Sequence, residues 1–330
     1  MYIIAEIAQA HDGSLGIAHS YIDALAGTGV HAVKFQTHIA HAESSVHEPF
    51  RVKFSYEDAT RYDYWKRMEF TADQWAGIKS HCEEKDLEFI SSPFSCAAVD
   101  LLEKLGVKKY KIGSGEVSNL LMLEKIALTG KDIILSSGMS SLRELDSTIG
   151  FLKPFGNSIS VLQCTTAYPT VAGQWGLDII KVLKERYGLP TGFSDHSGDI
   201  YAGLAATALG AELLEFHTVF DQRMFGPDAK ASITIDQVKK LVQGVNEITK
   251  DLQSNANKES SEAFNDLKKI FQKSLAVNKD LETGHAITFN DLEAKKPSGY
   301  GIDAKDFKMV IGKILKQKKS AQDFLNENDF

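Results

Sequence analysis

"LLEFHTVF", residues 213–220, is the last of eight short apolar runs along the chain, and the number of these runs decides the predicted fold. Amphipathic helical patterns separate the runs, such as the stretch 71–86 that opens with Thr71 as a cap. Runs rich in valine, isoleucine and leucine that are joined by helices are typical of a parallel sheet covered on both faces. Eight such units by about residue 255 predict a closed (β/α)8 TIM barrel, an α/β fold. The eight runs are YIIAEIA (2–8), AVKFQT (32–37), EFISSPF (88–94), KYKIGS (109–114), DIILSSG (132–138), SISVLQCT (158–165), LPTGFSD (189–195) and LLEFHTVF (213–220).

A doubly wound α/β sheet is the competing architecture. It usually has fewer strands and a glycine-rich phosphate turn after the first one. No G-x-G-x-x-G follows the first run, and "GSGE" at 113–116 is too short to count as one. The barrel is therefore the preferred prediction.

The chain changes character after the predicted barrel, which we place at residues 1–255. Residues 256–270 are polar and predict a linker, and residues 271–330 predict a small second domain of short strands broken by glycine and proline. A long insertion at 38–70 separates the second run from its helix. Long barrel loops often act as lids over a site, and surface decoration is the alternative.

Composition excludes several classes of function. The 330 residues are 43% hydrophobic and carry a formal net charge of −7, which argues against nucleic acid or an acidic membrane surface as the main partner. The apolar runs are too short to span a membrane, and the N-terminus lacks the pattern of a signal peptide, so we expect a cytoplasmic protein. The three cysteines show no C-x-x-C pairing, which argues against a disulfide framework.

Two histidines are candidates for binding a metal ion. In a barrel of this kind the chemistry lies at the carboxyl ends of the strands. His196 and His217 follow the seventh and eighth runs, which are neighbours in the barrel, so their imidazoles are expected to converge on one divalent ion. The sequence offers no obvious third Cys or His ligand, which argues against a closed structural zinc site. A satisfied structural histidine is the alternative at each position.

Two lysines end the second and fourth runs. Because a buried ammonium group needs an anionic partner, Lys34 and Lys111 predict a site for a phosphate and a carboxylate. One alternative is a Schiff-base nucleophile of an aldolase, and another is pairing with Glu6, Glu116 or Glu215 across the barrel mouth. Four strand-end serines would add neutral donors to a phosphate cradle: Ser92, Ser114, Ser136 and Ser194.

Further polar residues lie where they could contact a sugar. Glu6, Glu116 and Asp228 are placed to handle protons or sugar hydroxyls, and Tyr168 could donate a hydrogen bond to a substrate. For Tyr168, simple packing is the alternative.

The order of the motifs resembles the sialic acid (nonulosonic acid) synthase family. The resemblance spans nearly the whole chain and rests on many separate motifs with sensible gaps. These are IIAEIAQAHDGSLGIAHSYIDA, AVKFQT, FISSPFS, YKIGSGEV, ILSSGM, LQCTTAYPT, GFSDHSG, LLEFHTVFDQRMFGPDAKAS, KSLAVNKDLETG and AKKPSGYGI.

The resemblance implies a condensation of phosphoenolpyruvate with an acylamino aldose such as N-acetylmannosamine, which gives a nine-carbon 2-keto sugar acid and phosphate. It also implies a barrel followed by a small antifreeze-protein-like (SAF) domain, swapped across a homodimer so that it caps the partner's site. The two histidines would ligate a divalent ion, Mn²⁺ first and Mg²⁺ or Co²⁺ as alternatives. The implied phosphoenolpyruvate site is Lys34, Ser92, Lys111, Ser114, Ser136 and Ser194; the implied aldose contacts are Gln36, Glu116, Tyr168 and Asp228; Glu6 would lie near the metal and its water.

Three departures from the family pattern concern substrate choice. The loop after the first run reads Ala-His-Asp-Gly at 10–13 where the family usually has Asn-His-x-Gly, and Thr166 stands where Asn or Ser is frequent. Lys296 stands where sialic acid synthases carry an arginine that reaches the N-acetyl group. Because arginine and lysine differ in bidentate geometry, precursors of legionaminic or pseudaminic acid fit as well as N-acetylmannosamine does.

Three rival functions remain open at this point. A sister synthase would make another keto-sugar acid from phosphoenolpyruvate with the same lysines. A pyruvate aldolase would form an imine at Lys34 or Lys111. A non-catalytic sugar-acid sensor would bind its ligand without turnover, which the density of ionisable residues at the strand ends disfavours.

Overall fold

The computed structural model describes residues 1–52, 54–254 and 258–330 and divides into two compact units, Met1–Ser254 and Asn255–Phe330. Each unit has a hydrophobic core of its own. The predicted boundary between barrel and linker, at residues 255 and 256, lies outside the described residues.

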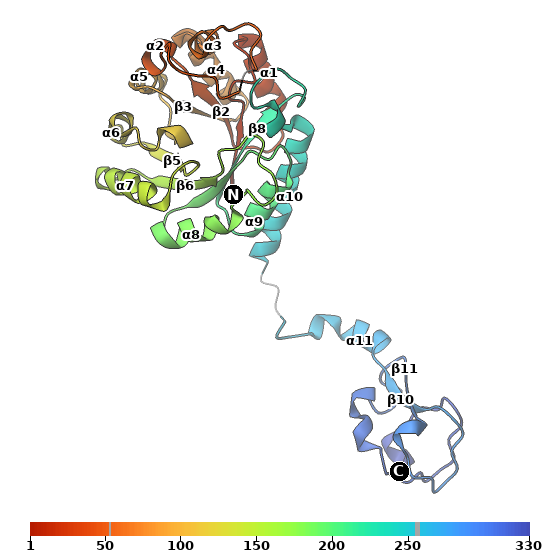
Figure 1. The fold of residues 1–330 in the computed structure, drawn as a ribbon. Coiled ribbons are helices and arrows are strands. Elements are labelled where there is room, and N and C mark those ends of the chain that lie inside the picture. The colour runs from red at the N-terminus through yellow and green to blue at the C-terminus, as the bar shows by residue number, and fades with distance from the viewer. Residues whose placement is uncertain (53, 255–257) are drawn as a thin grey trace. The chain divides into compact units, whose positions relative to one another are not determined.

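The first unit is a closed barrel. Strands β1 to β8 are parallel and pair in chain order, and β1 also pairs with β8 (Figure 1). The predicted (β/α)8 barrel is therefore confirmed, and the doubly wound sheet is excluded because its strand order is neither sequential nor closed. A short strand, β9 (Ile233–Thr234), continues the sheet beside β8. The eight barrel strands are β1 (Tyr2–Glu6), β2 (Ala32–Thr37), β3 (Glu88–Pro93), β4 (Lys109–Ile112), β5 (Asp132–Ser136), β6 (Ile159–Cys164), β7 (Thr191–Asp195) and β8 (Leu213–Val219).

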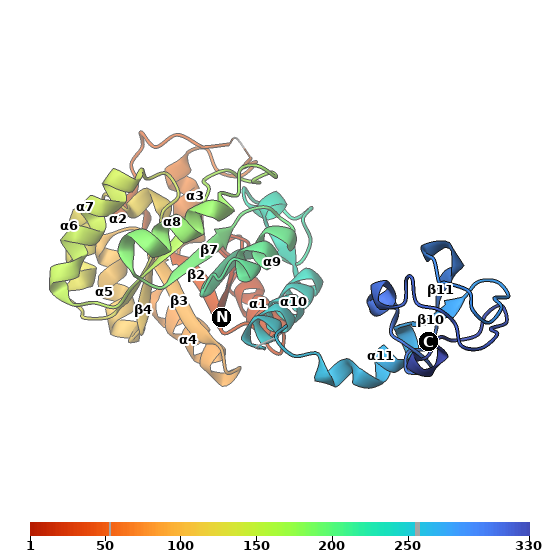
Figure 2. The same cartoon turned by 90° about the horizontal axis from the view of Figure 1, so that it is seen from below.

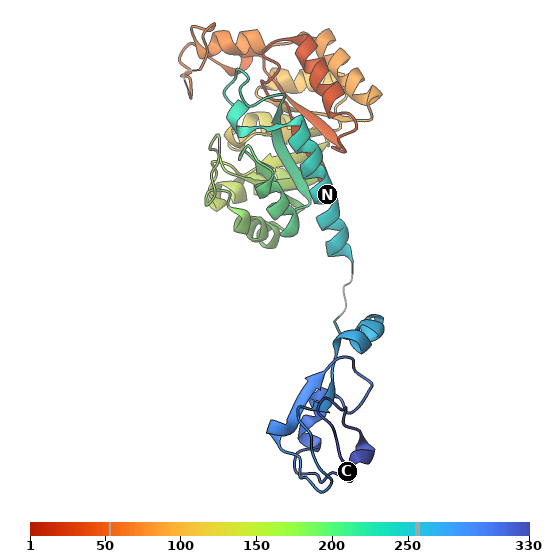
Figure 3. The ribbon, with the colours of Figure 1, turned by 90° about the vertical axis from the view of Figure 1, so that its right-hand side faces the viewer.

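Helices surround the strands, as Figure 1 shows, and Figure 2 shows the same helices from below. The α-helices are α1 (Leu15–Leu25), α2 (Ala40–Glu43), α3 (Arg61–Met68), α4 (Ala72–Glu84), α5 (Cys96–Leu105), α6 (Leu120–Ala127), α7 (Leu142–Leu152), α8 (Leu177–Tyr187), α9 (Tyr201–Ala208) and α10 (Ile235–Gln253). Short 3-10 helices are η1 (Ser114–Glu116), η2 (Lys153–Phe155) and η3 (Ala229–Ala231). The last helix, α10, packs against α9 and β8 (Figure 3).

Polar side chains cap the starts of several helices, including Thr71 as predicted. Ser14 accepts from the backbone N–H of Ile17 at the start of α1, and Thr71 forms a capping box at the start of α4. Ser141 caps α7 and forms a capping box with Glu144. These local bonds satisfy backbone donors that the helix leaves free, so they fix where each helix begins.

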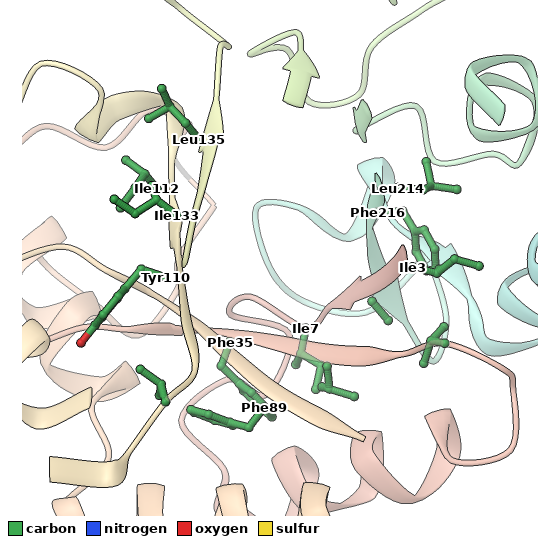
Figure 4. Packing of buried hydrophobic residues seen from close by; sticks show 14 of the residues in the cluster. Ile3, Ile7, Phe35, Phe89, Tyr110, Ile112, Ile133, Leu135, Leu214 and Phe216 are labelled. Atoms are coloured by element: carbon green, nitrogen blue, oxygen red, sulfur yellow. The ribbon is translucent and has the colours of Figure 1, made fainter. Parts of the chain in front are cut away.

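Side chains on the barrel strands alternate between two cores. The outward-facing set packs under the helices and includes Ile3, Phe35, Tyr110 and Phe216 (Figure 4). The inward-facing set forms a separate apolar layer of Ile4, Ala32, Ile90, Ile134, Leu162 and Leu213. Because side chains two residues apart share a face, the next inward position toward the carboxyl end of each strand is also fixed.

The predicted insertion at 38–70 contains α2 and α3 and a small core of its own. Ala40, Tyr64, Trp65 and Met68 are buried together. The insertion is therefore a packed element, which sets where its side chains lie.

The second unit is small and mostly irregular. Strands β10 (Ser274–Val277) and β11 (Leu292–Lys295) are antiparallel, and the buried cluster is Leu275, Val277, Leu281, Ile287, Val310, Leu315 and Leu325. Part of the predicted linker is helical, since η4 (Glu262–Phe264) is followed by α11 (Asn265–Phe271). Three further 3-10 helices are η5 (Phe289–Asp291), η6 (Ala304–Met309) and η7 (Glu327–Asp329).

Across the described ranges, none of the helices combines the length and apolar character needed to cross a membrane.

Candidate functional site

A layer of polar side chains lies above the apolar layer inside the barrel. It follows from the alternation of side chains: Glu6 comes two residues after Ile4, Lys34 two after Ala32, and Ser136 two after Ile134. The members with at most 5% exposure are Glu6, Lys34, Ser92, Lys111, Ser136, Ser194, His196, Glu215 and His217. The sequence therefore brings eight of the predicted site residues, together with Glu215, to one end of the barrel.

Lys34 pairs with Glu6 across β1 and β2. Its Nζ lies 2.6 Å from Glu6 Oε1, and the two residues are register partners. Burial alone would raise the pKa of the Glu6 carboxyl, but the charges of Lys34, His217 and Lys111 together lower it below its usual range. Glu6 is therefore ionised at neutral pH.

Lys111 pairs with Glu215 on β8. Lys111 Nζ lies 3.0 Å from Glu215 Oε1, and Lys34 Nζ lies 3.8 Å from Glu215 Oε2. Burial alone would lower the pKa of Lys111, but the charges of Glu215 and then Glu6 raise it above its usual value. Both lysines thus pair with carboxylates, which was one of the alternatives for them. Glu215 lies in this site although it is not among the predicted catalytic or substrate-binding residues.

The four predicted serines differ in their partners. Ser92 Oγ accepts from Lys34 Nζ at 3.3 Å, and Ser194 Oγ donates to Glu215 Oε1 at 2.9 Å. Ser114 Oγ lies 3.2 Å from the thiol sulfur of Cys164. Ser136 Oγ is buried and has no hydrogen-bond partner within the described residues. A buried hydroxyl without a partner is costly, so it is a candidate contact for a ligand oxygen.

His196 and His217 lie next to each other, with ring centroids 5.2 Å apart. His196 Nδ1 donates to the carbonyl oxygen of Thr165 at 2.9 Å, which leaves Nε2 as the free lone-pair donor. Burial, and secondarily the charge of His217, lowers the pKa of His196 to about 4. A neutral imidazole at pH 7 is the form that ligates a metal ion.

Among the described residues, the two imidazoles do not belong to a larger cluster of metal-ligating side chains. Nε2 of His217 lies 3.2 Å from Glu6 Oε2, and over residues 1–52, 54–254 and 258–330 no group of three or more His, Cys, Asp or Glu side chains is arranged to hold an ion. The donor set fits an open two-histidine site whose other positions are taken by substrate or water, and it does not fit a closed structural site.

Tyr168 joins the histidines to the insertion. Its ring stacks on His196, with centroids 4.3 Å apart, and the guanidinium carbon of Arg51 lies 4.2 Å from the ring centroid. Arg51 also pairs with Asp228, Nη2 to Oδ1, at 2.8 Å. Arg51 therefore connects the β2 insertion to two predicted sugar contacts. No local sequence pattern indicates this residue, because its position depends on how the insertion packs.

The other predicted contacts lie around the mouth. Gln36 Nε2 donates to Glu6 Oε1 at 2.7 Å. Glu116 is partly buried on η1 and accepts from Asn119, and burial raises the pKa of its carboxyl. Thr166 is exposed but lies close to Ser114 across Gly138, since a Cβ on Gly138 would lie 1.9 Å from Ser114 Oγ and 2.7 Å from Thr166 Oγ1. Only glycine fits between these two loops.

Lys296 belongs to the second unit. Its Nζ lies 4.9 Å from the centroid of the Phe271 ring. That it reaches a substrate stays a prediction.

Comparisons with known proteins show which family the chain is similar to. The model of the NeuB family matches residues 21–257. The chain is 33% identical to the N,N'-diacetyllegionaminic acid synthase of Campylobacter jejuni subsp. jejuni serotype O:2, over 98% of each chain. It is 29% identical to the pseudaminic acid synthase of Helicobacter pylori, over 99% of this chain and 97% of the other.

A solved structure supports the same relationship. The N-acetylneuraminic acid synthetase of Leptospira borgpetersenii serovar Hardjo-bovis superposes with a TM-score of 0.70 at 28% identity, covering 81% of this chain and 89% of the other. Because the family model covers most of the barrel and the relatives align along almost the whole chain, this protein belongs to the NeuB family of nonulosonic acid synthases.

Proposed function

We propose that the protein condenses phosphoenolpyruvate with an acylamino aldose to give a nonulosonic acid and phosphate. The observation that carries the proposal is the pair of buried ammonium groups of Lys34 and Lys111 in one barrel mouth. The same mouth holds two imidazoles and the hydroxyl of Ser136, which has no hydrogen-bond partner among the described residues. Two cations and a free donor suit a ligand with both a carboxylate and a phosphate.

The proposed phosphoenolpyruvate site is Lys34, Ser92, Lys111, Ser114, Ser136 and Ser194. Buried cations and neutral hydroxyls in a dry pocket bind anions more strongly than exposed ones do. The carboxylates of Glu6 and Glu215 already pair with the lysines, so they keep each ammonium group oriented before the ligand arrives.

A divalent ion, Mn²⁺ first and Mg²⁺ or Co²⁺ as alternatives, would be held by His196 and His217. It would supply a Lewis acid for the carbonyl oxygen of the aldose. Thr165 fixes the tautomer of His196 for that role.

The proposed reaction forms one carbon–carbon bond. C3 of phosphoenolpyruvate attacks the aldehyde carbon of the open-chain aldose, whose oxygen takes up a proton. Water adds to C2 and gives one proton to a base. The new hydroxyl then loses its remaining proton as the C2=O bond forms, the bond between C2 and the bridging oxygen breaks, and phosphate leaves with that oxygen. Glu6, ionised and held by Lys34 and Gln36, is placed to orient that water.

The proposed aldose contacts are Gln36, Glu116, Thr166, Tyr168 and Asp228. The relatives include synthases of legionaminic acid, pseudaminic acid and N-acetylneuraminate 9-phosphate, which supports an acylamino aldose as the second substrate. They do not distinguish N-acetylmannosamine from the precursors of legionaminic or pseudaminic acid. A sister synthase acting on another sugar is therefore a second candidate, separated by the sugar panel below.

A pyruvate aldolase is disfavoured by electrostatics. An imine-forming lysine needs a lowered pKa, whereas the carboxylates of Glu215 and Glu6 hold the pKa of Lys111 above its usual value. Borohydride with pyruvate is therefore expected to leave the protein unlabelled.

We further propose that the second unit is an SAF domain, that Lys296 acts on an aldose bound in a partner's barrel within a domain-swapped homodimer, and that the protein works in the cytoplasm. The family resemblance of the KSLAVNKDLETG and AKKPSGYGI motifs supports the domain assignment. Sedimentation of the full chain tests the dimer, and a monomer that turns over substrate at full rate contradicts it.

The decisive experiment measures phosphate release from phosphoenolpyruvate with each aldose, before and after chelation and after Mn²⁺ is restored. We expect release with at least one acylamino aldose, loss on chelation, and loss of turnover in His196→Ala and His217→Ala with the fold retained. Oxygen-18 in the bridging position should leave with phosphate. Label retained in the keto acid, or full activity in both histidine variants, contradicts the proposal.

A further inference from the structure

A chain of side-chain contacts leads from Glu6 to His38 and Glu43, two residues that the proposed chemistry does not use. His38 directly follows β2, and its Nδ1 lies 2.7 Å from Oε1 of Glu43 at the end of α2. The other oxygen of Glu43 accepts from the backbone N–H of Ile39 at 3.3 Å. The carboxylate is thus anchored to the loop that carries the imidazole.

The other nitrogen of His38 faces two amides. His38 Nε2 lies 3.1 Å from Gln9 Nε2 and 3.2 Å from Gln36 Oε1. Gln9 also donates to Gln36 Oε1, and Gln36 Nε2 donates to Glu6 Oε1 at 2.7 Å. The contacts therefore run without interruption from α2 to the carboxylate in the barrel mouth.

One arrangement of protons forms the hydrogen bonds of this chain, and in it His38 Nε2 and Gln36 Oε1 are two neighbouring acceptors that both accept from Gln9. If His38 carries its proton on Nδ1, it donates to Glu43 and its Nε2 accepts from Gln9. The second N–H of the Gln9 amide then donates to Gln36 Oε1, so the Gln36 amide must present its N–H to Glu6. The orientation of each amide thus depends on the one before it.

The ring of His38 is held in place from both faces. Trp65 stacks on one face with centroids 3.9 Å apart and planes 19° apart, and Phe94 on the other at 4.6 Å and 14°. His38 is 3% exposed. A ring clamped in this way has its two nitrogens fixed in direction, which is what an orienting group needs.

We propose that His38, anchored by Glu43, is a positioning residue that fixes the amides of Gln9 and Gln36 and, through Gln36, the carboxylate of Glu6. The inference rests on the proposed function, in which Gln36 contacts the aldose and Glu6 orients water. A misaligned Gln36 amide lowers the rate of the bond-forming steps and weakens aldose binding, while the lysines and serines that hold phosphoenolpyruvate stay in place.

Variants of His38 separate positioning from packing. His38→Phe keeps an aromatic ring between Trp65 and Phe94 but removes both nitrogens, whereas His38→Gln keeps a polar group near the position of Nε2. We expect His38→Phe to lower kcat by about tenfold or more, with KM for phosphoenolpyruvate within about twofold of wild type, and His38→Gln to recover most of the loss. Wild-type kcat in His38→Phe, or equal losses in both variants, overturns the proposal.

A second pair of variants guards against misfolding at His38. Glu43→Ala removes the anchor, and Glu43→Gln keeps an acceptor for the Nδ1 proton. The expected kcat falls in Glu43→Ala and returns toward wild type in Glu43→Gln, with thermal unfolding showing that both are folded. Unchanged kcat in a folded Glu43→Ala variant overturns the proposal.

A readout without turnover separates this inference from the proposed function. In ¹⁵N spectra of histidine-labelled protein near pH 7.5, the His38 signal, assigned by its absence in His38→Phe, is expected to show protonation at Nδ1 alone. Protonation at Nε2 overturns the network even if the enzyme is active. Absence of phosphate release from wild type, with the expected tautomer present, refutes the proposed function and leaves the network standing.

Discussion

Lys111 and Glu215 are almost fully buried, and each would be costly as an isolated charge. Their pairing with each other, and of Lys34 with Glu6, makes a group of four side chains whose formal charges cancel. Removing one member leaves its partner uncompensated, so variants here need a charge-matched control.

Lys111→Met tests the anion site. The change leaves the Glu215 carboxylate without its closest cation, and we expect a loss of about 3–5 kcal/mol in unfolding free energy together with phosphoenolpyruvate use lowered by at least about 100-fold in kcat/KM. In the double variant Lys111→Met/Glu215→Gln, stability should largely return while activity stays low. Denaturant unfolding and phosphate release measure the two effects, and recovered activity in the double variant would contradict the assignment.

His11 gives a pH-dependent stability. Burial, with smaller contributions from His38 and Arg67, lowers its pKa from the ordinary 6.5 to about 3. Because the folded-state pKa is the lower one, the unfolded chain takes up the proton first, and stability is lost as pH falls from about 6.5 toward 3.

The expected size of that loss is roughly 2 kcal/mol at pH 5. In the wild type, His11 Nδ1 accepts a hydrogen bond from the backbone N–H of Gly13 at 3.1 Å. His11→Asn keeps an acceptor for this bond and removes the titrating imidazole. Its stability should therefore fall less steeply than that of wild type between pH 6.5 and 5, as measured by denaturant unfolding. Parallel pH profiles would show that His11 is not responsible.

Side chains at the strand ends could be predicted, and those of the β2 insertion could not. The ends of the apolar runs are enough to place Lys34, Lys111 and His217 in the barrel mouth, because the carboxyl ends of the strands meet there. His38 and Arg51 take their positions from the packing of the insertion around Trp65 and Tyr64, which no local pattern encodes. Glu215 was considered only as a possible partner for a lysine, because a buried carboxylate beside a histidine has no distinctive spacing.

Among the elements, the β2 insertion at 38–70 adds side chains to the barrel mouth from outside the strands. Its helix α3 carries Trp65 against His38, and its loop carries Arg51 to Tyr168 and Asp228. The sequence left open whether the insertion is a lid or decoration. These contacts with predicted sugar-binding residues favour an element that shapes the sugar side of the mouth.

Arg51→Ala tests that function of the insertion. Losing the guanidinium frees Asp228 and uncovers the ring of Tyr168, so we expect KM for the aldose to rise by about three- to tenfold, with KM for phosphoenolpyruvate unchanged. Arg51→Lys keeps the charge without the planar group and should lie between wild type and Arg51→Ala. Steady-state kinetics with each substrate varied in turn measures the split, and an unchanged aldose KM would argue for decoration.

At the scale of the whole molecule, the chain is two units with separate cores. The barrel core and the Leu275-to-Leu325 cluster share no residue, so each unit buries its own set of apolar side chains. We therefore expect each unit to fold on its own. The barrel could be predicted from the count of apolar runs. The second unit, with two short strands and many turns, has too little periodicity for its fold to follow from pattern alone.

A fragment of residues 1–254 tests this independence. We expect it to fold, with cooperative thermal unfolding and native helix content by circular dichroism, because the core of the barrel lies wholly within it. Its turnover should be at least about tenfold below that of the full chain if the second unit caps a site as proposed. An unfolded or aggregated fragment would show that the barrel depends on the rest of the chain.

The group of Lys34, Glu6, Lys111 and Glu215 has no net formal charge, and this affects the binding of any multiply charged anion. Because the charges of these four groups cancel, a bound anion makes the interior of the barrel net negative. Binding of the anion is therefore expected to be accompanied by uptake of protons or of a metal ion. Calorimetry of ligand binding in buffers with different heats of ionisation would reveal that exchange. By thermodynamic linkage, the affinity of the site for that proton or metal ion would be higher while the anion is bound.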